Sequence, residues 1–219
     1  MYLEYVCYDY SLNEIETSQL VASIIKMGIK NIGVFQYSIS GLKSVLSPDI
    51  SLSCPLDFPY GLSDTKSRNF LVAQACKSGA SKIDIVIPSK ILTNRKYDKL
   101  REDIRSNLAI CEEQGVELRY ILEYRIFSHG VLAKSCEILK SLGIKTVLPS
   151  SGTMIDDIND NLIVCNFLMT KTGIGVICNG NIYSAQHVEK IYKTQPQGVR
   201  LHHKNSVSLC ITQGMMSDG

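Results

Sequence analysis

Hydrophobic positions along the chain follow two patterns that alternate. Short apolar runs, such as IDIVI at 83–87, are followed by longer segments in which apolar residues recur every three or four positions. The short runs are typical of buried strands and the longer segments of amphipathic helices. Several helical segments are followed by glycine, as at Gly28, Gly79, Gly115 and Gly143, where a helix readily ends.

These patterns predict eight strands, with a helix after each of the first seven and a short polar tail after the eighth. The predicted strands cover 3–8, 31–36, 50–58, 82–88, 117–124, 144–149, 174–179 and 198–203. The predicted helices cover 11–28, 39–46, 62–78, 92–114, 129–141, 154–167 and 184–193.

Regular alternation of this kind implies parallel strands joined by helical crossovers. Eight such units in 219 residues fit an α/β protein with a (β/α)8 TIM barrel, formed by a single domain over residues 1–219. A doubly wound sheet is the alternative. It is disfavoured because the first strand–helix turn lacks the GxGxxG pattern that would cradle a dinucleotide.

The composition narrows the function classes. The net charge is only +2, with scattered basic residues, so we expect no nucleic-acid partner. No apolar stretch approaches the roughly 20 residues of a membrane span, and the first residues do not resemble a signal peptide. The eight cysteines form no CxxC pair, so we expect reduced thiols in a cytoplasmic protein rather than a zinc ribbon or a redox motif.

In a barrel of this type the chemistry lies at the C-terminal ends of the strands. Asp84 is the most informative residue there, because it interrupts an apolar run in which an unpaired charge would be costly. Glu123 similarly follows an apolar run, and Asp9 follows the first strand. These three carboxylates are the candidate catalytic residues, although a single carboxylate at such a position is often only a helix cap.

Six sequence blocks, in order, resemble those of the deoxyribose-phosphate aldolases, which are class I aldolases of the (β/α)8 type. They are DYSL (9–12), DFPYG (57–61), GASKIDIVI (79–87), YILEY (120–124), VLPSSG (147–152) and IGVICNGNI (174–182). The resemblance covers about residues 5 to 204.

This resemblance implies an aldol cleavage or condensation through a lysine Schiff base, aided by a second lysine and a carboxylate. The carboxylate position corresponds to Asp84, but the two lysine positions correspond to Leu148 and Ile177. It further implies a small-molecule ligand, a sugar phosphate or an aldehyde, held by residues at the ends of three strands. The candidate binding residues are Ser150, Ser151, Gly152, Asn179, Gly180 and Lys204.

Three interpretations stay open. The chain is a divergent lyase that uses acid–base groups, a catalytically inactive pseudoenzyme that binds a ligand or regulates a partner, or an aldolase with a relocated lysine, for which Lys204 is the candidate. No cofactor is expected. A metal bound by Asp57, Asp84, Glu123 and either His202 or Cys178 is disfavoured because these residues lack a recognised ligand spacing. A homodimer is an alternative to a monomer.

The absence of the two lysines should also change the charge balance around Asp84. Asp84, Leu148 and Ile177 should point into one shared cavity at the C-terminal ends of the strands. Without lysine counter-charges, the pKa of Asp84 should be raised, or a cation from Arg125, Lys204 or His202 should pair with it.

Overall fold

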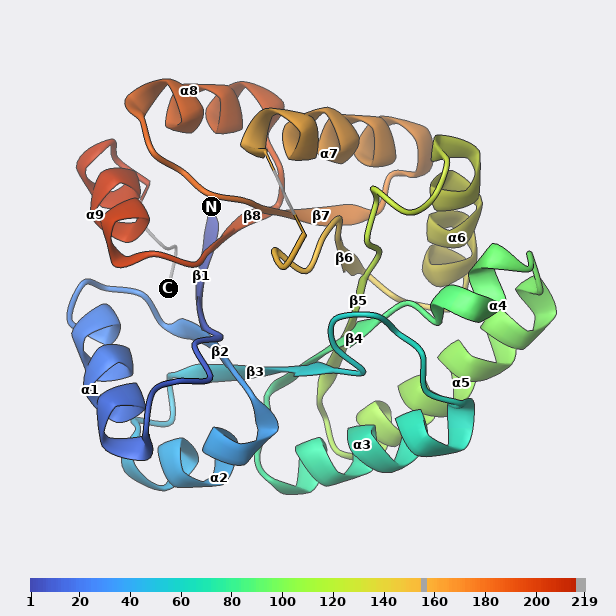
Figure 1. Ribbon diagram of the computed structural model, residues 1–219, viewed down its shortest axis with the longest axis horizontal. Coiled ribbons are helices and arrows are strands. Elements are labelled where there is room, and N and C mark those ends of the chain that lie inside the picture. Colours follow the sequence, from blue (N-terminus) through green and yellow to red (C-terminus); the bar gives the residue numbers. More distant parts are fainter. Residues whose placement is uncertain (155–156, 216–219) are drawn as a thin grey trace.

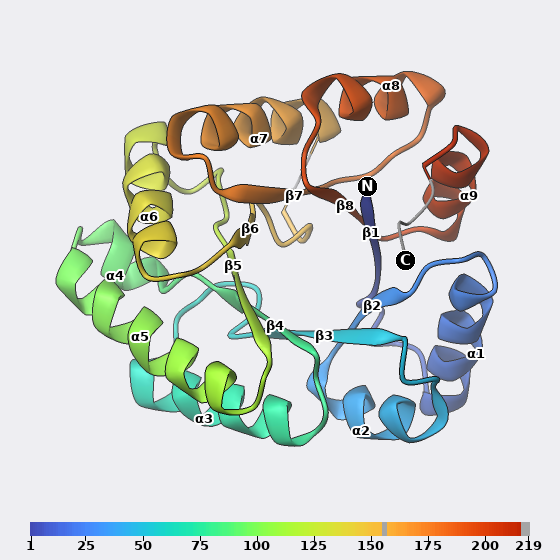
Figure 2. The same ribbon diagram turned by 180° about the vertical axis from the view of Figure 1, so that it is seen from behind.

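In a computed structural model, which describes residues 1–154 and 157–215, eight parallel strands close into one barrel surrounded by helices (Figure 1; Figure 2 from behind). The strands are β1 Tyr2–Cys7, β2 Asn31–Val34, β3 Ser51–Leu56, β4 Lys82–Val86, β5 Glu117–Ile121, β6 Thr146–Leu148, β7 Gly175–Asn179 and β8 Gly198–Leu201. The helices are α1 Glu14–Ile25, α2 Gln36–Val45, α3 Thr65–Lys77, α4 Ser89–Thr93, α5 Tyr97–Glu113, α6 His129–Ser141, α7 Ile158–Thr172, α8 Ala185–Thr194 and α9 Lys204–Thr212.

Closure of the sheet distinguishes the two predicted folds. Each strand pairs in parallel with the next, and β1 pairs with β8, where Glu4 lies opposite Arg200. A doubly wound sheet would leave two open edges. The (β/α)8 prediction is therefore confirmed, and the doubly wound alternative is wrong.

Two helical predictions differ from the structure. The segment predicted as one helix over 92–114 is divided into α4 and α5, because Arg95 adopts a left-handed backbone conformation (φ +52°) that ends the first helix. The predicted polar tail contains α9, whose Val207 and Cys210 are buried. Residues 155–156 of the helix predicted near 154–167 lie outside the described residues; α7 begins at Ile158.

The strands are buried on both faces, which explains their nearly continuous apolar sequences. On β4, Ile83 and Ile85 alternate with Asp84 and Val86, and all four side chains are fully buried. Neighbouring residues of a strand point to opposite faces. Asp84 and Val86 therefore face the barrel interior, while the two isoleucines face the surrounding helices. Among the described residues, no helix is long and apolar enough to cross a membrane.

Candidate active site at the barrel mouth

Four charged side chains meet inside the barrel. Arg119 donates to Asp84 (Nε–Oδ1 2.6 Å) and to Glu4 (Nη2–Oε1 2.8 Å). Arg200 donates to Glu4 (Nη2–Oε2 2.6 Å) and forms a very short contact with Asp84. All four residues are at most 1% exposed. Each acid is therefore neutralised by two arginines, and each arginine by two acids.

This ring of four charges corrects the sequence-based expectation about Asp84. A cation does pair with Asp84, but it comes from Arg119 and Arg200 rather than from Arg125, Lys204 or His202. Arg125 instead pairs with Asp160 on α7, at 2.8 Å. The sequence signal was a charge at an interior position of three other strands, in LEYV, LRYI and VRL. That these charges meet one another follows only from the closure of the barrel, which joins β1 to β8.

Burial and charge act in opposite directions on this ring. Burial alone would raise the pKa of Glu4, but the guanidinium groups of Arg119 and Arg200 outweigh it and hold that pKa below its usual range. Burial likewise would lower the pKa of Arg119, but Asp84 and Glu4 raise it overall. Glu4 and Arg119 are therefore both charged at neutral pH. The ring of four charges serves as a structural core.

An apolar layer lies next to this ring, toward the C-terminal ends of the strands. Val86, Ile121, Leu148 and Ile177 form one buried cluster, against which Phe58 packs. Leu148 is 0% exposed and Ile177 is 2% exposed. Leu148 and Ile177 therefore face the barrel interior as expected, but they fill it with Val86 and Ile121. The expected open cavity shared with Asp84 is not formed, because aliphatic and aromatic side chains occupy that space.

Aromatic rings cover this layer. Tyr8, Phe35 and Phe58 follow β1, β2 and β3, and their ring centroids are 5.0 to 5.9 Å apart. The Tyr8 hydroxyl also accepts a hydrogen bond from Arg200 Nη1 (3.4 Å). The aromatic cluster thus separates the charged ring from the mouth of the barrel. Sequence reasoning missed the role of Tyr8, for which the aromatic residues at the ends of successive strands were the available signal.

A cavity of about 450 Å³ opens at the mouth, beside β1 and β8. Its lining includes Tyr8, Ser151, Gly152, Asn181, His203 and Lys204. Lys204 and His203 supply the basic groups, and α9 begins at Lys204, so the positive end of its helix dipole lies at the same rim. The cavity is suited to a small anionic molecule.

His202 fixes the wall of this cavity. Its Nε2 donates to Asn179 Oδ1 (2.5 Å), because the Asn179 amide nitrogen itself donates to the Ser150 carbonyl (2.8 Å). Burial, together with the nearby charge of Arg200, lowers the pKa of His202 to about 3, so the ring is neutral at physiological pH. Gly152 adopts φ +80°, and a Cβ there would lie 2.7 Å from His202 Cε1. The turn after β6 therefore requires glycine.

The predicted site residues fall into two groups. Asp9, Ser151, Gly152 and Lys204 line the mouth cavity. Asp84, Glu123, Ser150, Asn179 and Gly180 are buried beneath or beside it.

Several of the predicted residues have structural partners. Glu123 accepts a very short hydrogen bond from the Ser151 backbone amide, and Ser150 Oγ accepts from Asn161 Nδ2 (3.1 Å). Asp9 is exposed and accepts from the Ser11 amide and hydroxyl, which lower the pKa of its carboxyl. Asp9 is thus the predicted catalytic carboxylate that a ligand in the cavity could reach.

The metal alternative has no support in the geometry. Asp57 is engaged by Arg68 Nη1 at 2.5 Å, while Asp84 is held by the charged ring. Within residues 1–154 and 157–215, no three His, Cys, Asp or Glu side chains lie close enough together to hold a metal ion.

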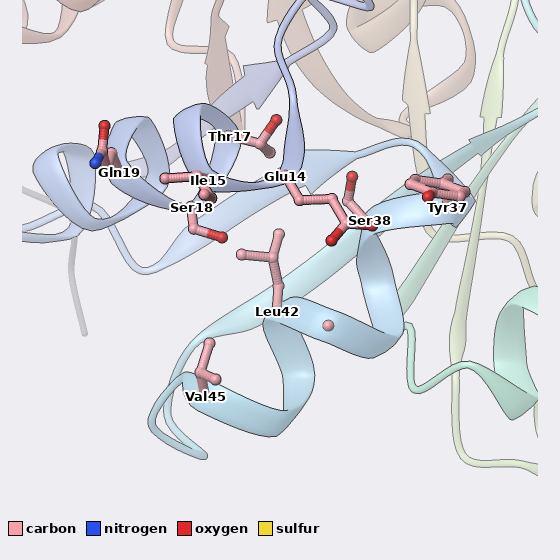
Figure 3. Close-up of a pocket in the computed structure, with 10 residues that line it drawn as sticks. Glu14, Ile15, Thr17, Ser18, Gln19, Tyr37, Ser38, Leu42 and Val45 are labelled. Atoms are coloured by element: carbon pink, nitrogen blue, oxygen red, sulfur yellow. The ribbon is translucent and has the colours of Figure 1, made fainter.

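A second hollow, of about 450 Å³, lies outside the barrel between α1 and α2 (Figure 3). Ile15, Leu42 and Val45 form its apolar part, and the Tyr37 hydroxyl hydrogen-bonds to Glu14 at its rim. It lies between two helices outside the barrel, whereas barrel proteins place their chemistry at the mouth, above the C-terminal ends of the strands. The mouth cavity is therefore the better candidate site.

Comparison with known proteins finds curated relatives described as deoxyribose-phosphate aldolases. A deoxyribose-phosphate aldolase of Thermococcus gammatolerans is 27% identical over 137 residues, which are 61% of this chain and 61% of that protein. The match thus spans less than two thirds of that relative. A deoxyribose-phosphate aldolase of Clostridium novyi is 24% identical over 184 residues, 80% of this chain and 77% of that protein. No protein-family model matches the chain.

The fold agrees with these relatives. A solved structure described as QR15, an aldolase, superposes with a TM-score of 0.84 at 19% identity, covering 95% of this chain and 91% of that one. The chain thus shares its (β/α)8 barrel fold with this aldolase structure. In sequence, the chain is similar to the deoxyribose-phosphate aldolases among its curated relatives.

Proposed function

We propose that this chain binds a small anionic ligand of the sugar-phosphate or phosphorylated-aldehyde class at the barrel mouth, without forming a Schiff base. The observation that carries the proposal is the buried apolar layer containing Leu148 and Ile177, which are 0% and 2% exposed. The family resemblance implies that these positions correspond to the two lysines of the family's reaction. An aliphatic side chain cannot form an imine, and here it also fills the space that a substrate would need.

The mouth cavity supports the binding half of the proposal. Lys204, His203 and the first turn of α9 favour an anion, and Ser151 and Gly152 also line the cavity. Tyr8 contributes an aromatic surface against which a sugar or aldehyde carbon chain can pack. On this interpretation the chain is a binding or regulatory barrel derived from a catalytic one.

Acid–base catalysis on the same class of ligand is the second candidate function. One observation favours it: the exposed carboxylate of Asp9 lines the same cavity as Lys204. A carboxylate beside a bound carbonyl compound can act as a general base. Asp84 and Glu123 are less suited to that role, since both are buried and hydrogen-bonded to other residues.

Calorimetric titration with 2-deoxyribose 5-phosphate and with inorganic phosphate tests the binding proposal. We expect saturable binding that weakens at least tenfold in Lys204→Ala. The matched control is Lys193→Ala on α8, which removes a lysine whose side chain is 73% exposed and which should leave binding unchanged. Equal affinity in wild type and Lys204→Ala would refute the assigned site.

Borohydride trapping with the same sugar phosphate tests the absence of a Schiff base. We expect no covalent mass increase on any peptide that lines the mouth. An adduct on Lys204, with turnover abolished by Lys204→Ala, would instead support the relocated-lysine interpretation. Turnover without an adduct, abolished by Asp9→Asn, would favour acid–base catalysis.

A further inference from the structure

Lys82 lies at the opposite end of the barrel from the mouth. It precedes Asp84 by two residues on β4, so its side chain leaves the strand on the same interior face. Its Nζ donates to Ser51 Oγ (2.6 Å) on β3 and to Asn31 Oδ1 (3.0 Å) on β2, and it lies 5.2 Å from the centroid of the Tyr2 ring. Tyr2, Asn31, Ser51 and Lys82 are all partly exposed. Solvent therefore reaches part of each of these side chains at this end of the barrel.

The surroundings of this amine, burial first among them, disfavour its protonated form. In the part of the chain that the structure describes, no carboxylate forms an ion pair with Lys82, and both of its hydrogen-bond acceptors are neutral. Burial is the larger cause and the Arg119 guanidinium the next cause of the lowered pKa of Lys82. Glu4, Glu117 and Asp84 act in the other direction without reversing it.

Each nearby carboxylate has a reason for its weak effect. Glu4 and Asp84 are held by both arginines of the charged ring. Glu117 is exposed at the start of β5, where solvent screens its charge. The Tyr2 hydroxyl accepts from Arg119 Nη1 (3.0 Å) and donates to Glu4 (3.2 Å), so it is a fixed neutral neighbour.

We propose that Lys82 is a reaction site independent of the mouth cavity: a nucleophilic amine that takes small aldehydes as a reversible imine. The uncharged nitrogen attacks the carbonyl carbon, the carbonyl oxygen takes up the two protons that the nitrogen loses and leaves as water, and a C=N bond forms. No oxidant or reductant is consumed. Ser51 and Asn31 hold the nitrogen in position without stabilising an ammonium ion as a carboxylate would.

Competitive labelling of the whole chain tests this site. The protein is treated briefly with formaldehyde and cyanoborohydride, which converts each imine into a stable methylamine, and every lysine is quantified by mass spectrometry of the digest. At pH 7 we expect Lys82 to react at least fivefold faster than Lys193, whose side chain is 73% exposed. The ratio should fall toward one near pH 10.5, where exposed amines also lose their protons. A Lys82 rate no greater than that of Lys193 at pH 7 would overturn the proposal.

Two variants separate electrostatics from access. Asn31→Asp places a carboxylate where a neutral oxygen now lies 3.0 Å from the amine, and it should slow labelling of Lys82 at pH 7 at least tenfold while Lys193 is unchanged. Ser51→Ala removes a neutral acceptor and should change the rate by less than threefold. A folded Asn31→Asp protein that labels Lys82 at the wild-type rate contradicts the mechanism. If circular dichroism shows that this variant is unfolded, the wild-type pH series decides alone.

Discussion

Glu4 and Arg200 are direct partners in the register between β1 and β8, and their side chains form a fully buried ion pair across the seam where the barrel closes. They are separated by 196 residues in the sequence. The last strand therefore carries a buried charge, that of Arg200, which Glu4 of the first strand and Asp84 neutralise.

Removing one member of this buried pair should be strongly destabilising. Glu4→Gln leaves two buried guanidinium groups with only Asp84 as a carboxylate partner, and we expect a loss of about 3–5 kcal/mol in the free energy of unfolding. Urea denaturation at pH 7 measures it. Glu189→Gln is the control: it breaks an exposed pair with Lys193 and should cost less than about 1 kcal/mol. A Glu4→Gln protein as stable as wild type would show that the ring contributes little.

The same ring predicts a stability change in acid. The folded-state pKa of Glu4 is depressed, since the two arginines outweigh its burial. Its stabilising contribution is therefore fully present above the unfolded-state pKa of about 4.3 and is lost as the pH falls below that value. We expect the difference in stability between wild type and Glu4→Gln to shrink progressively below pH 4.5. A difference that stays constant down to the acid transition would argue against this assignment.

His202 should contribute to the pH dependence in a milder range. Its pKa is depressed to about 3 by burial and by Arg200, so the folded protein keeps it neutral while the unfolded chain binds a proton below about pH 6.5. The stabilisation is present above pH 6.5 and is lost as the pH falls toward 3. In NMR spectra the His202 ring signals should not titrate between pH 5 and 8, and a midpoint near 6.5 would contradict the buried, neutral ring.

Glycine 152 offers a test of the mouth geometry. Gly152→Ala forces an alanine to φ +80° and places its Cβ against His202, so we expect a loss of at least 1 kcal/mol and weaker ligand binding at the mouth. Gly41→Ala is the matched control. It lies inside α2 with nothing within 4 Å of the added Cβ, and should stabilise the chain by about 0.5–1 kcal/mol. Equal effects of the two substitutions would show that the turn tolerates a side chain.

Restoring one lysine should not restore an aldolase. Leu148→Lys places an amine in the apolar layer beside Val86, Ile121 and Ile177, where burial lowers its pKa and costs about 3 kcal/mol or more of stability. Ile177 still lacks the amine that would tune it. We expect no borohydride-trapped adduct with 2-deoxyribose 5-phosphate on the peptide that contains position 148, and near-normal stability for the control Leu148→Met. Efficient trapping in Leu148→Lys would show that a substrate can enter the layer.

The sequence determined the architecture because hydrophobic periodicity is local. Alternating strand and helix patterns gave the eight units and their order, and strand ends gave Ser151, Gly152 and Lys204 as residues of one rim. Asp84 was recognisable as a charge that needed a partner inside an apolar strand. The division of 92–114 into two helices was not recognisable, since it depends on the backbone conformation of a single residue, Arg95.

The tertiary structure alone decided which charges meet. Arg119 and Arg200 lie 35 and 116 residues from Asp84 and became its partners only when the sheet curved and closed, because side chains from opposite strands of a barrel share one interior. Closure also decided that Leu148 and Ile177 join two other aliphatic residues in a filled layer beneath the mouth cavity. Packing of this kind depends on all eight strands at once, and no single stretch of sequence specifies it.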